Sequence, residues 1–180
     1  IVVTQSPDHF IPGTSNVIQG ELELKQDLLC MDITQGCAGY IVGLMQAFML
    51  LEQPSINRVV LINGDVLSRK VSIHDRNSFP LIGDAVSITL IENKESDRVY
   101  ANIKMDGKGR DALAIPAGGF RMPSNEKTSV LEDVGDGNKR SKDHLRMDGS
   151  AVFNFVQSKV PDMVEELLDF SKTSLTEIDY

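Results

Sequence analysis

The sequence has 180 residues, of which 41% are hydrophobic and 24% are charged, and it carries a formal net charge of −8. A chain of this length can bury a core as one large domain or as parts of two, and its acidity argues against a general nucleic-acid-binding role. Two cysteines are too few for a disulfide framework, and the most apolar stretch is shorter than the roughly 20 residues of a membrane span. We therefore expect a cytoplasmic protein without a membrane or nucleic-acid partner.

The first third of the chain alternates strand and helix patterns. Ile1–Thr4 is typical of a strand, and because it opens the sequence without a methionine, we expect an N-terminal truncation. A short helix is expected at Val17–Leu24. Leu28–Ile33 and Arg58–Asn63 predict buried strands, and Ala38–Glu52 between them is apolar on every side, which predicts a helix enclosed on all faces. This order of strand, helix and strand predicts a right-handed βαβ unit with a parallel sheet.

The middle of the chain is more polar. The stretch 66–80 is mixed in character, as suits a surface that faces a ligand. Ala85–Glu92 and Arg98–Met105 predict an antiparallel hairpin. Residues 107–143 are rich in Gly, Lys, Asp and Ser without a sustained period, which predicts a partly ordered, mobile linker.

The last helix is expected to begin after Asp148, which is a good N-cap residue, and to break or restart at Pro161. The final residues, Leu175–Tyr180, are typical of the approach to a further strand.

Cys37 is the strongest candidate for chemistry. It lies in Asp32–Tyr40, where a strand-like run meets a helix-like run, and Gly36 and Ala38 leave room for a ligand to approach the sulfur. A thiol at the first turn of a helix experiences the positive end of the helix dipole, which favours the thiolate that a nucleophile needs. A lone cysteine in front of a buried helix can also be a small core residue. Cys30 is expected to be a buried strand residue without a chemical role.

Four segments of the sequence match one enzyme family in order and spacing. They are Asp32–Tyr40, Gly64–Arg69, Asp75-Arg76 with Leu81–Ala85, and Arg146–Gly149 with Val152-Phe153. Through them the chain resembles the β-ketoacyl-acyl carrier protein synthase III family of thiolase-like condensing enzymes. The resemblance implies an incomplete thiolase-like α/β fold: a mixed sheet with a buried helix after the nucleophile strand, plus the first helix of the second half. It assigns residues 1–106 to the first half-domain, 107–147 to a linker and 148–180 to the second half-domain.

The activity that the resemblance implies is an acyl transfer that initiates fatty acid biosynthesis. Cys37 would accept an acyl group from acyl-CoA as a thioester, and malonyl-acyl carrier protein would lose CO2 to give the carbanion that attacks it. Arg76 falls where the family places an arginine near the CoA adenine. Ile11 falls in a loop that borders the partner subunit's acyl pocket, at a place where the family often has Phe. No metal and no cofactor beyond these substrates is implied.

The family's catalytic His and Asn would follow Tyr180, so we expect a fragment that is inactive alone. A homodimer is expected through Leu28–Ile33, because an unpaired apolar edge strand would otherwise aggregate. The acyl carrier protein and acyl-CoA are the other expected partners. Two alternatives stay open: a related condensing enzyme of secondary metabolism, and a non-catalytic structural or dimerising module.

Several other residues have a structural and a functional interpretation, of which the structural one is favoured. Gly83-Asp84 is expected to be a turn, and Met45 and Met49 are expected to fill the core. His74 and Asp75 are weak metal-ligand candidates without a third ligand. A set of four cations could receive an acidic carrier protein or be solvated linker residues: Lys139, Arg140, Lys142 and Arg146.

Overall fold

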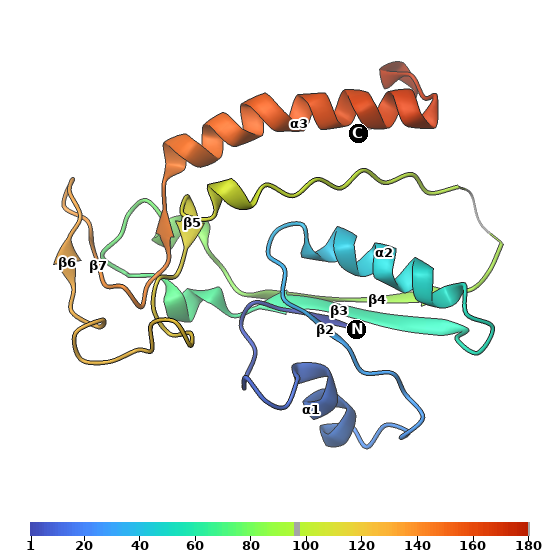
Figure 1. Ribbon diagram of the computed structural model, residues 1–180, viewed down its shortest axis with the longest axis horizontal. Helices are drawn as coiled ribbons and strands as arrows, with labels where there is room; N and C mark the ends of the chain where they lie inside the picture. The colour runs from blue at the N-terminus through green and yellow to red at the C-terminus, as the bar shows by residue number, and fades with distance from the viewer. Residues whose placement is uncertain (96–97, 180) are drawn as a thin grey trace. The chain divides into compact units, whose positions relative to one another are not determined.

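A computed structural model describes residues 1–95 and 98–179 (Figure 1). The described residues form two compact units. The first consists of residues 1–69 and 83–95, and the second consists of residues 70–82 and 98–179. The predicted division at residues 106 and 147 concerns the half-domains of the whole fold and stays a prediction.

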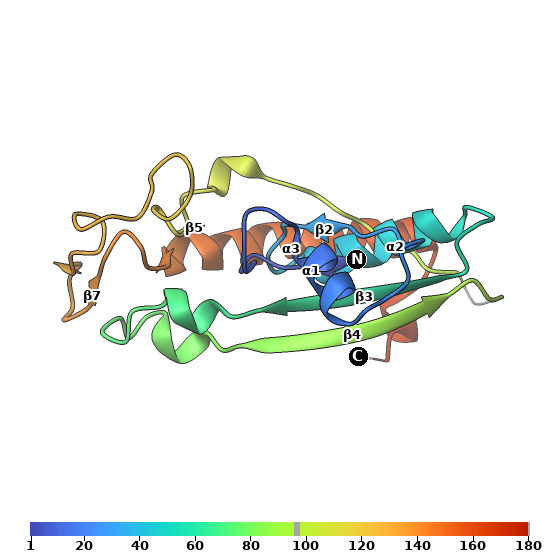
Figure 2. The same ribbon diagram turned by 90° about the horizontal axis from the view of Figure 1, so that it is seen from below.

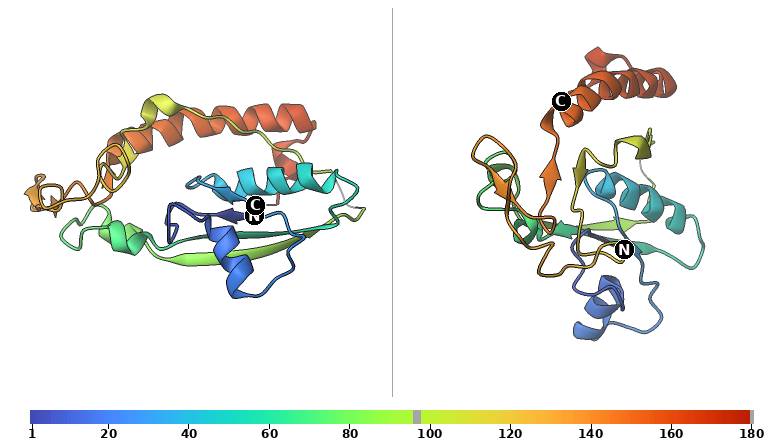
Figure 3. Two further views of the ribbon diagram at one scale, coloured as in Figure 1. Left: turned by 60° about the horizontal axis from the view of Figure 1, so that its bottom comes forward. Right: turned by 60° about the vertical axis from the view of Figure 1, so that its left-hand side comes forward.

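The first unit is built on a mixed sheet of four strands. They lie in the order β2 (Asp32–Ile33), β1 (Val2–Val3), β3 (Arg58–Asp65) and β4 (Ala85–Glu92). β1 runs parallel to both β2 and β3, whereas β3 and β4 pair antiparallel along their full length (Figure 2). The predicted parallel sheet is therefore confirmed. The helices α1 (Thr14–Glu21) and α2 (Gly39–Leu51) lie on opposite sides of this sheet (Figures 1 and 3).

Small residues allow α2 to approach the sheet closely. Its buried residues recur every fourth position, at Gly39, Gly43, Ala47 and Leu51. A Cβ atom at position 39 would lie 2.5 Å from Cγ1 of Val3, so only glycine fits there without a shift of the strand. The helix was predicted at almost these bounds, but it is not enclosed on all faces: only the side with this four-residue period is buried in the described chain.

The exposed side of α2 carries large apolar side chains. Ile41, Phe48 and Met49 are all exposed, and Met45 is half-buried. The expectation that Met49 fills the core is therefore wrong for this chain. The prediction failed because the sequence shows that one side of a helix is apolar but does not show whether other residues cover that side.

Two of the predicted buried strands are less buried than expected. Leu28–Ile33 contributes only Asp32–Ile33 to the sheet, because its neighbour β1 is itself two residues long and a strand pairs only as far as its neighbour extends. Leu28 and Leu29 are exposed. In β3, burial alternates: Val59 and Leu61 are buried, whereas Val60 is 46% exposed, so only one side of this strand meets α2.

α1 begins three residues earlier than the sequence predicts. The carboxylate of Asp32 accepts the backbone N–H groups of Thr14 and Ser15, at 2.5 and 2.8 Å. These are donors of the first helical turn, which have no partner within the helix. The acceptor therefore comes from β2, 17 residues along the chain from Ser15, where no local capping signal reveals it.

In the second unit, residues 98–105 do not form the predicted partner of β4. They run extended beside α3 (Gly149–Ser171) (Figure 1). Asn102 donates to the carbonyl of Met163, Lys104 pairs with Glu166, and the rings of Tyr100 and Phe170 meet edge to face at 5.9 Å. The hairpin prediction was wrong because the apolar residues of this segment meet a helix instead of a strand. The predicted connection between the two strands of that hairpin includes residues 96–97, which lie outside the described residues.

The predicted mobile linker contains regular pairing. β5 (Leu113–Ala114) pairs antiparallel with β8 (Arg146–Met147), and β6 (Glu132–Asp133) pairs antiparallel with β7 (Lys139–Arg140). A short 3-10 turn lies at the start of the predicted linker, at Gly107–Gly109. Two others lie outside it, at Leu67–Lys70 and Phe79–Leu81. Two-residue strands are too short to give the sequence a recognisable period, which is why the pattern looked like a linker.

α3 begins where it was predicted and ends differently. The side chain of Asp148 accepts the N–H of Ala151 at 2.9 Å, which confirms the N-cap. The helix continues through Pro161, so the predicted break is wrong; helical turns on both sides hold that position. After the helix, Leu175–Glu177 forms a 3-10 turn with a capping box in place of the expected strand approach.

Candidate functional site

Cys37 lies in a tight turn between β2 and α2. Its neighbour Ala38 is the N-cap residue of the helix, and the N–H of Gly39 donates to the carbonyl of Gly36 at 2.7 Å across the turn. The thiol is exposed and forms no disulfide. It therefore lies just before the helix instead of in its first turn, at the carboxyl end of the parallel strand β2, the end at which open α/β sheets bind ligands.

Glycines on both sides of Cys37 lie close to neighbouring side chains. A Cβ atom at position 36 would lie 2.7 Å from Oε1 of Gln5, and a Cβ atom at position 39 would lie 2.5 Å from Val3. Gln5 and Val3 belong to β1 and the residues that follow it. The glycines on either side of the cysteine thus bring its turn directly against the end of the central parallel strand.

A polar network closes the same edge of the sheet. Oδ1 of Asp65, the last residue of β3, accepts from the hydroxyls of Thr4 and Ser6 and from the N–H of Gln5, at 3.0, 3.1 and 2.6 Å. The hydroxyl of Ser6 also accepts the N–H of Val66 at 2.8 Å. Sequence reasoning missed this network. The signal available for it was a set of small polar residues directly after one predicted strand and an aspartate directly after another.

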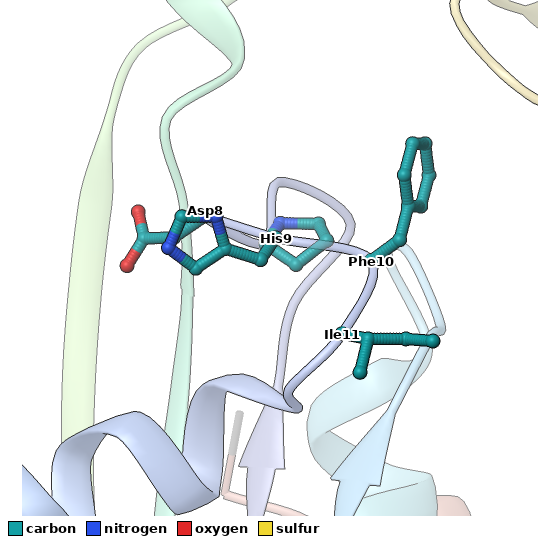
Figure 4. A pocket seen from close by; sticks show the side chains of 5 residues that line it. Asp8, His9, Phe10 and Ile11 are labelled. Carbon is teal, nitrogen blue, oxygen red and sulfur yellow. The ribbon is translucent and has the colours of Figure 1, made fainter.

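Ile11 lies in the loop that follows this network. The loop curls around a hollow of about 440 Å³ that is lined by residues 7–11 (Figure 4). The side chain of Ile11 is 88% exposed and points away from Asp8. Both Ile11 and Cys37 belong to the first unit, but no hydrogen bond of the described residues joins them. Cys30, the other cysteine, is half-buried and lies outside the strands.

Arg76 belongs to the second unit and is held by the turn between β6 and β7. Its backbone N–H donates to Oδ1 of Asn138 at 2.9 Å, and Nη2 of its guanidinium donates to the carbonyl of Asp136 at 2.8 Å. Arg76 is an exposed residue, whereas Asn138 is only 2% exposed. The structure thus shows a charged side chain at the surface whose root is fixed by a buried amide.

The neighbouring Asp75 is fully buried and structurally engaged. Burial alone would raise its pKa, but the N–H of Asn77, the hydroxyl of Ser78 and the guanidinium of Arg140 together hold the pKa below its ordinary value. The ion pair with Arg140 spans 3.0 Å. Among the residues that the structure describes, no group of three His, Cys, Asp or Glu side chains could hold a metal ion.

Asp84 and two of the four candidate cations have bonding partners in the structure. Asp84 accepts from the backbone and the hydroxyl of Ser68, and these hydrogen bonds lower its pKa, whereas Gly83 and Asp84 themselves form no turn, so the expected turn is not observed. Of the four candidate cations for an acidic partner, Arg140 pairs with Asp75 and Arg146 pairs with Asp111.

None of the described helices is both long and apolar enough to cross a membrane.

A mixed sheet with helices on both sides and an exposed cysteine directly before one of them is the arrangement of the thiolase-like condensing-enzyme fold. A crystal structure of a 3-oxoacyl-(acyl-carrier-protein) synthase III matches with a TM-score of 0.92 and 28% identity, over 99% of this chain and 54% of that one. A 3-oxoacyl-(acyl-carrier-protein) synthase from Burkholderia xenovorans matches with a TM-score of 0.81 and 31% identity, over 99% and 50% of the two chains.

The model of the 3-oxoacyl-[acyl-carrier-protein] synthase III family matches residues 31–109 of this chain, a range that includes both Cys37 and Arg76. A Campylobacter jejuni protein provisionally named as such a synthase is 36% identical over the whole of this chain and 51% of its own length. A Fusobacterium nucleatum β-ketoacyl-[acyl-carrier-protein] synthase III is 28% identical, over 99% of this chain and 52% of its own length. The chain thus spans about half the length of these relatives.

Proposed function

We propose that this chain is the cysteine-bearing part of a condensing enzyme that joins an acyl-CoA primer to malonyl-acyl carrier protein. The observation that carries the proposal is the exposed Cys37 in a glycine-packed turn at the carboxyl end of the parallel strands. An exposed thiol in a fixed turn is accessible to a thioester and is held in one orientation toward it. The names of the relatives include the acyl carrier protein and the 3-oxoacyl product, and the acyl-CoA primer is what the family resemblance implies.

The proposed reaction has two balanced steps. In the first, the Cys37 thiolate attacks the thioester carbonyl of acyl-CoA; the new carbon–sulfur bond replaces the one to CoA, which leaves as a thiolate. In the second, malonyl-acyl carrier protein loses CO2, and the electron pair of the broken bond forms a carbon–carbon bond to the acyl group. The thiolate of Cys37 is regenerated, and 3-oxoacyl-acyl carrier protein is released.

Two further residues have proposed binding roles. Arg76 is proposed to contact the nucleotide of acyl-CoA, because an exposed guanidinium can stack on an aromatic base and pair with phosphate. Ile11 is proposed to border an acyl pocket, because its apolar side chain is almost fully exposed on a curled loop.

The test is covalent labelling of the full-length gene product. The protein is incubated with radiolabelled acyl-CoA, precipitated and counted, and the label is tested for release by hydroxylamine, which cleaves thioesters. The Cys37→Ala variant is expected to lose all label, whereas Cys30→Ala is the matched control and is expected to keep it. Equal labelling of wild type and Cys37→Ala would refute the proposed nucleophile. Labelling without condensation would favour a non-catalytic module, and profiling of acyl donors would separate a fatty acid enzyme from a secondary-metabolism relative.

We also propose that the protein is a homodimer through the β2 edge. β2 lies at the end of the strand order, and the preceding Leu28 and Leu29 are exposed together with Ile41 and Met49 of α2. Exposed apolar side chains beside a free strand edge favour pairing with a second copy. Light scattering at micromolar concentration is expected to give twice the chain mass. A monomer mass there would contradict the proposal.

A further inference from the structure

The β6–β7 hairpin is bonded to the turn at residues 72–78 through both backbone and side-chain groups. The hydroxyl of Ser72 donates to the carbonyl of Lys139 at 2.6 Å, and the N–H of Lys139 donates to the carbonyl of His74 at 3.0 Å. Asp75 pairs with Arg140, as described above. The turn is therefore bonded to the hairpin at three successive places before Arg76 is reached.

Arg76 itself donates two hydrogen bonds to the tip of the same hairpin. Asn138 accepts its backbone N–H, and the Asp136 carbonyl accepts from its guanidinium. Asn138 is in turn fixed, because its Nδ2 donates to the carbonyl of Gly135 at 3.2 Å. The tip needs three consecutive residues with positive φ, which are Gly135, Asp136 and Gly137, at 92°, 53° and 75°. This backbone course directs the Asp136 carbonyl toward the arginine.

A guanidinium has five N–H donors in a fixed fork, and the Asp136 carbonyl engages Nη2. One bond of this kind fixes the direction of the side chain while leaving its plane available to a ligand. Holding a long side chain in place before binding removes part of the rotamer entropy that binding would otherwise cost. The hairpin therefore holds Arg76 in position before a ligand binds, as hydrogen-bonding neighbours do at other binding sites.

We propose that the β6–β7 hairpin positions Arg76 for the nucleotide of the acyl donor, and that Asn138 is the positioning residue that carries this link. The inference rests on the proposed function, because it assumes that acyl-CoA is the donor. It assigns a role to a segment whose sequence looked like a mobile linker. It also predicts that the hairpin matters only for donors that carry the nucleotide.

The experiment compares two donors on the full-length gene product: acyl-CoA, and the same acyl group on pantetheine, which lacks the nucleotide. Arg76→Ala is expected to raise KM for acyl-CoA by about tenfold or more, and Asn138→Ala by about fivefold, with kcat little changed. Neither variant should change KM for acyl-pantetheine. The double variant should be no worse than Arg76→Ala alone, because Asn138 acts through Arg76. Ser129→Ala, which loses only a local hydrogen bond to Glu126, is the matched control.

The outcomes separate this inference from the proposed function. If Asn138→Ala weakens both donors equally, or adds its full effect to that of Arg76→Ala, the role is structural and the inference is overturned. If Arg76→Ala has no effect while Cys37 is still labelled, the inference and the proposed binding role of Arg76 fail, and the proposed role of Cys37 stands. If wild type takes no acyl group from acyl-CoA, both fail. Should Asn138→Ala not fold, Gly137→Val tests the same link, because a β-branched residue strains a turn position at φ 75°.

Discussion

The closest approach between α2 and the sheet predicts the effect of one added methyl group. In Gly39→Ala, the new Cβ would lie 2.5 Å from Cγ1 of Val3 and 3.3 Å from Cβ of Gln35. Val3 is 1% exposed, and its β-branched side chain has few alternative rotamers, so it cannot move aside cheaply. Overpacking of this kind costs about 1–3 kcal/mol. The higher helix propensity of alanine offsets up to about 1 kcal/mol.

The net expectation for Gly39→Ala is a loss of about 1–2 kcal/mol in the free energy of unfolding, measured by urea denaturation. Gly20→Ala in α1 is the control: nothing lies within 4 Å of its Cβ, so the same substitution should be neutral or stabilising. Adding Val3→Ala to Gly39→Ala should recover part of the loss, because it removes the clashing methyl. The reasoning is refuted if Gly39→Ala and Gly20→Ala change stability alike.

Three other substitutions test contacts described above. Asp75→Asn should lower stability at neutral pH and flatten its acid dependence: the depressed pKa means that the carboxylate stabilises the fold above its unfolded pKa of about 3.9 and loses this effect as pH falls through the lower folded value. Unfolding curves from pH 7 to pH 2 measure this, and an unchanged slope would contradict it. Asp32→Ala removes the acceptor of two N–H groups of α1 and should cost about 1–2 kcal/mol, seen in thermal unfolding. Asp148→Ala should cost about 1 kcal/mol by losing the N-cap of α3, and unchanged urea midpoints would contradict both cap predictions.

The sequence predicted well those elements whose signals are local. α2 was found within one residue because its apolar run is long and ends near Pro54. The start of α3 was found because aspartate is one of the residues preferred at an N-cap, and Asp148 directly precedes the apolar helical pattern. The position of Cys37 between a strand and a helix was also correct, apart from a shift of about one residue relative to the helix start.

Long-range contacts explain what was missed. The start of α1 depends on Asp32, and residues 98–105 bond to α3. The backbone N–H of Arg76 bonds to Asn138, 62 residues further along the chain. None of these partners leaves a mark in the local pattern of its segment. The candidate residues could be named from motifs, but the network of Asp65 and the hairpin that holds Arg76 could not, since both are defined by which distant segments meet.

The two compact units are interleaved along the chain, and this has a consequence for synthesis on the ribosome. Residues 70–82 leave the first unit, and β4 then returns to it, whereas the contacts of the 70–82 segment come much later: Lys70 accepts from the N–H of Leu145, and Asp75 pairs with Arg140, 65 residues onward. At about 5–20 residues per second, this segment waits roughly 3–13 seconds for its partners after it has been made. The four strands of the first sheet can pair during that interval. Asp75, which is buried in the folded protein, is then still hydrated because Arg140 has not yet been made.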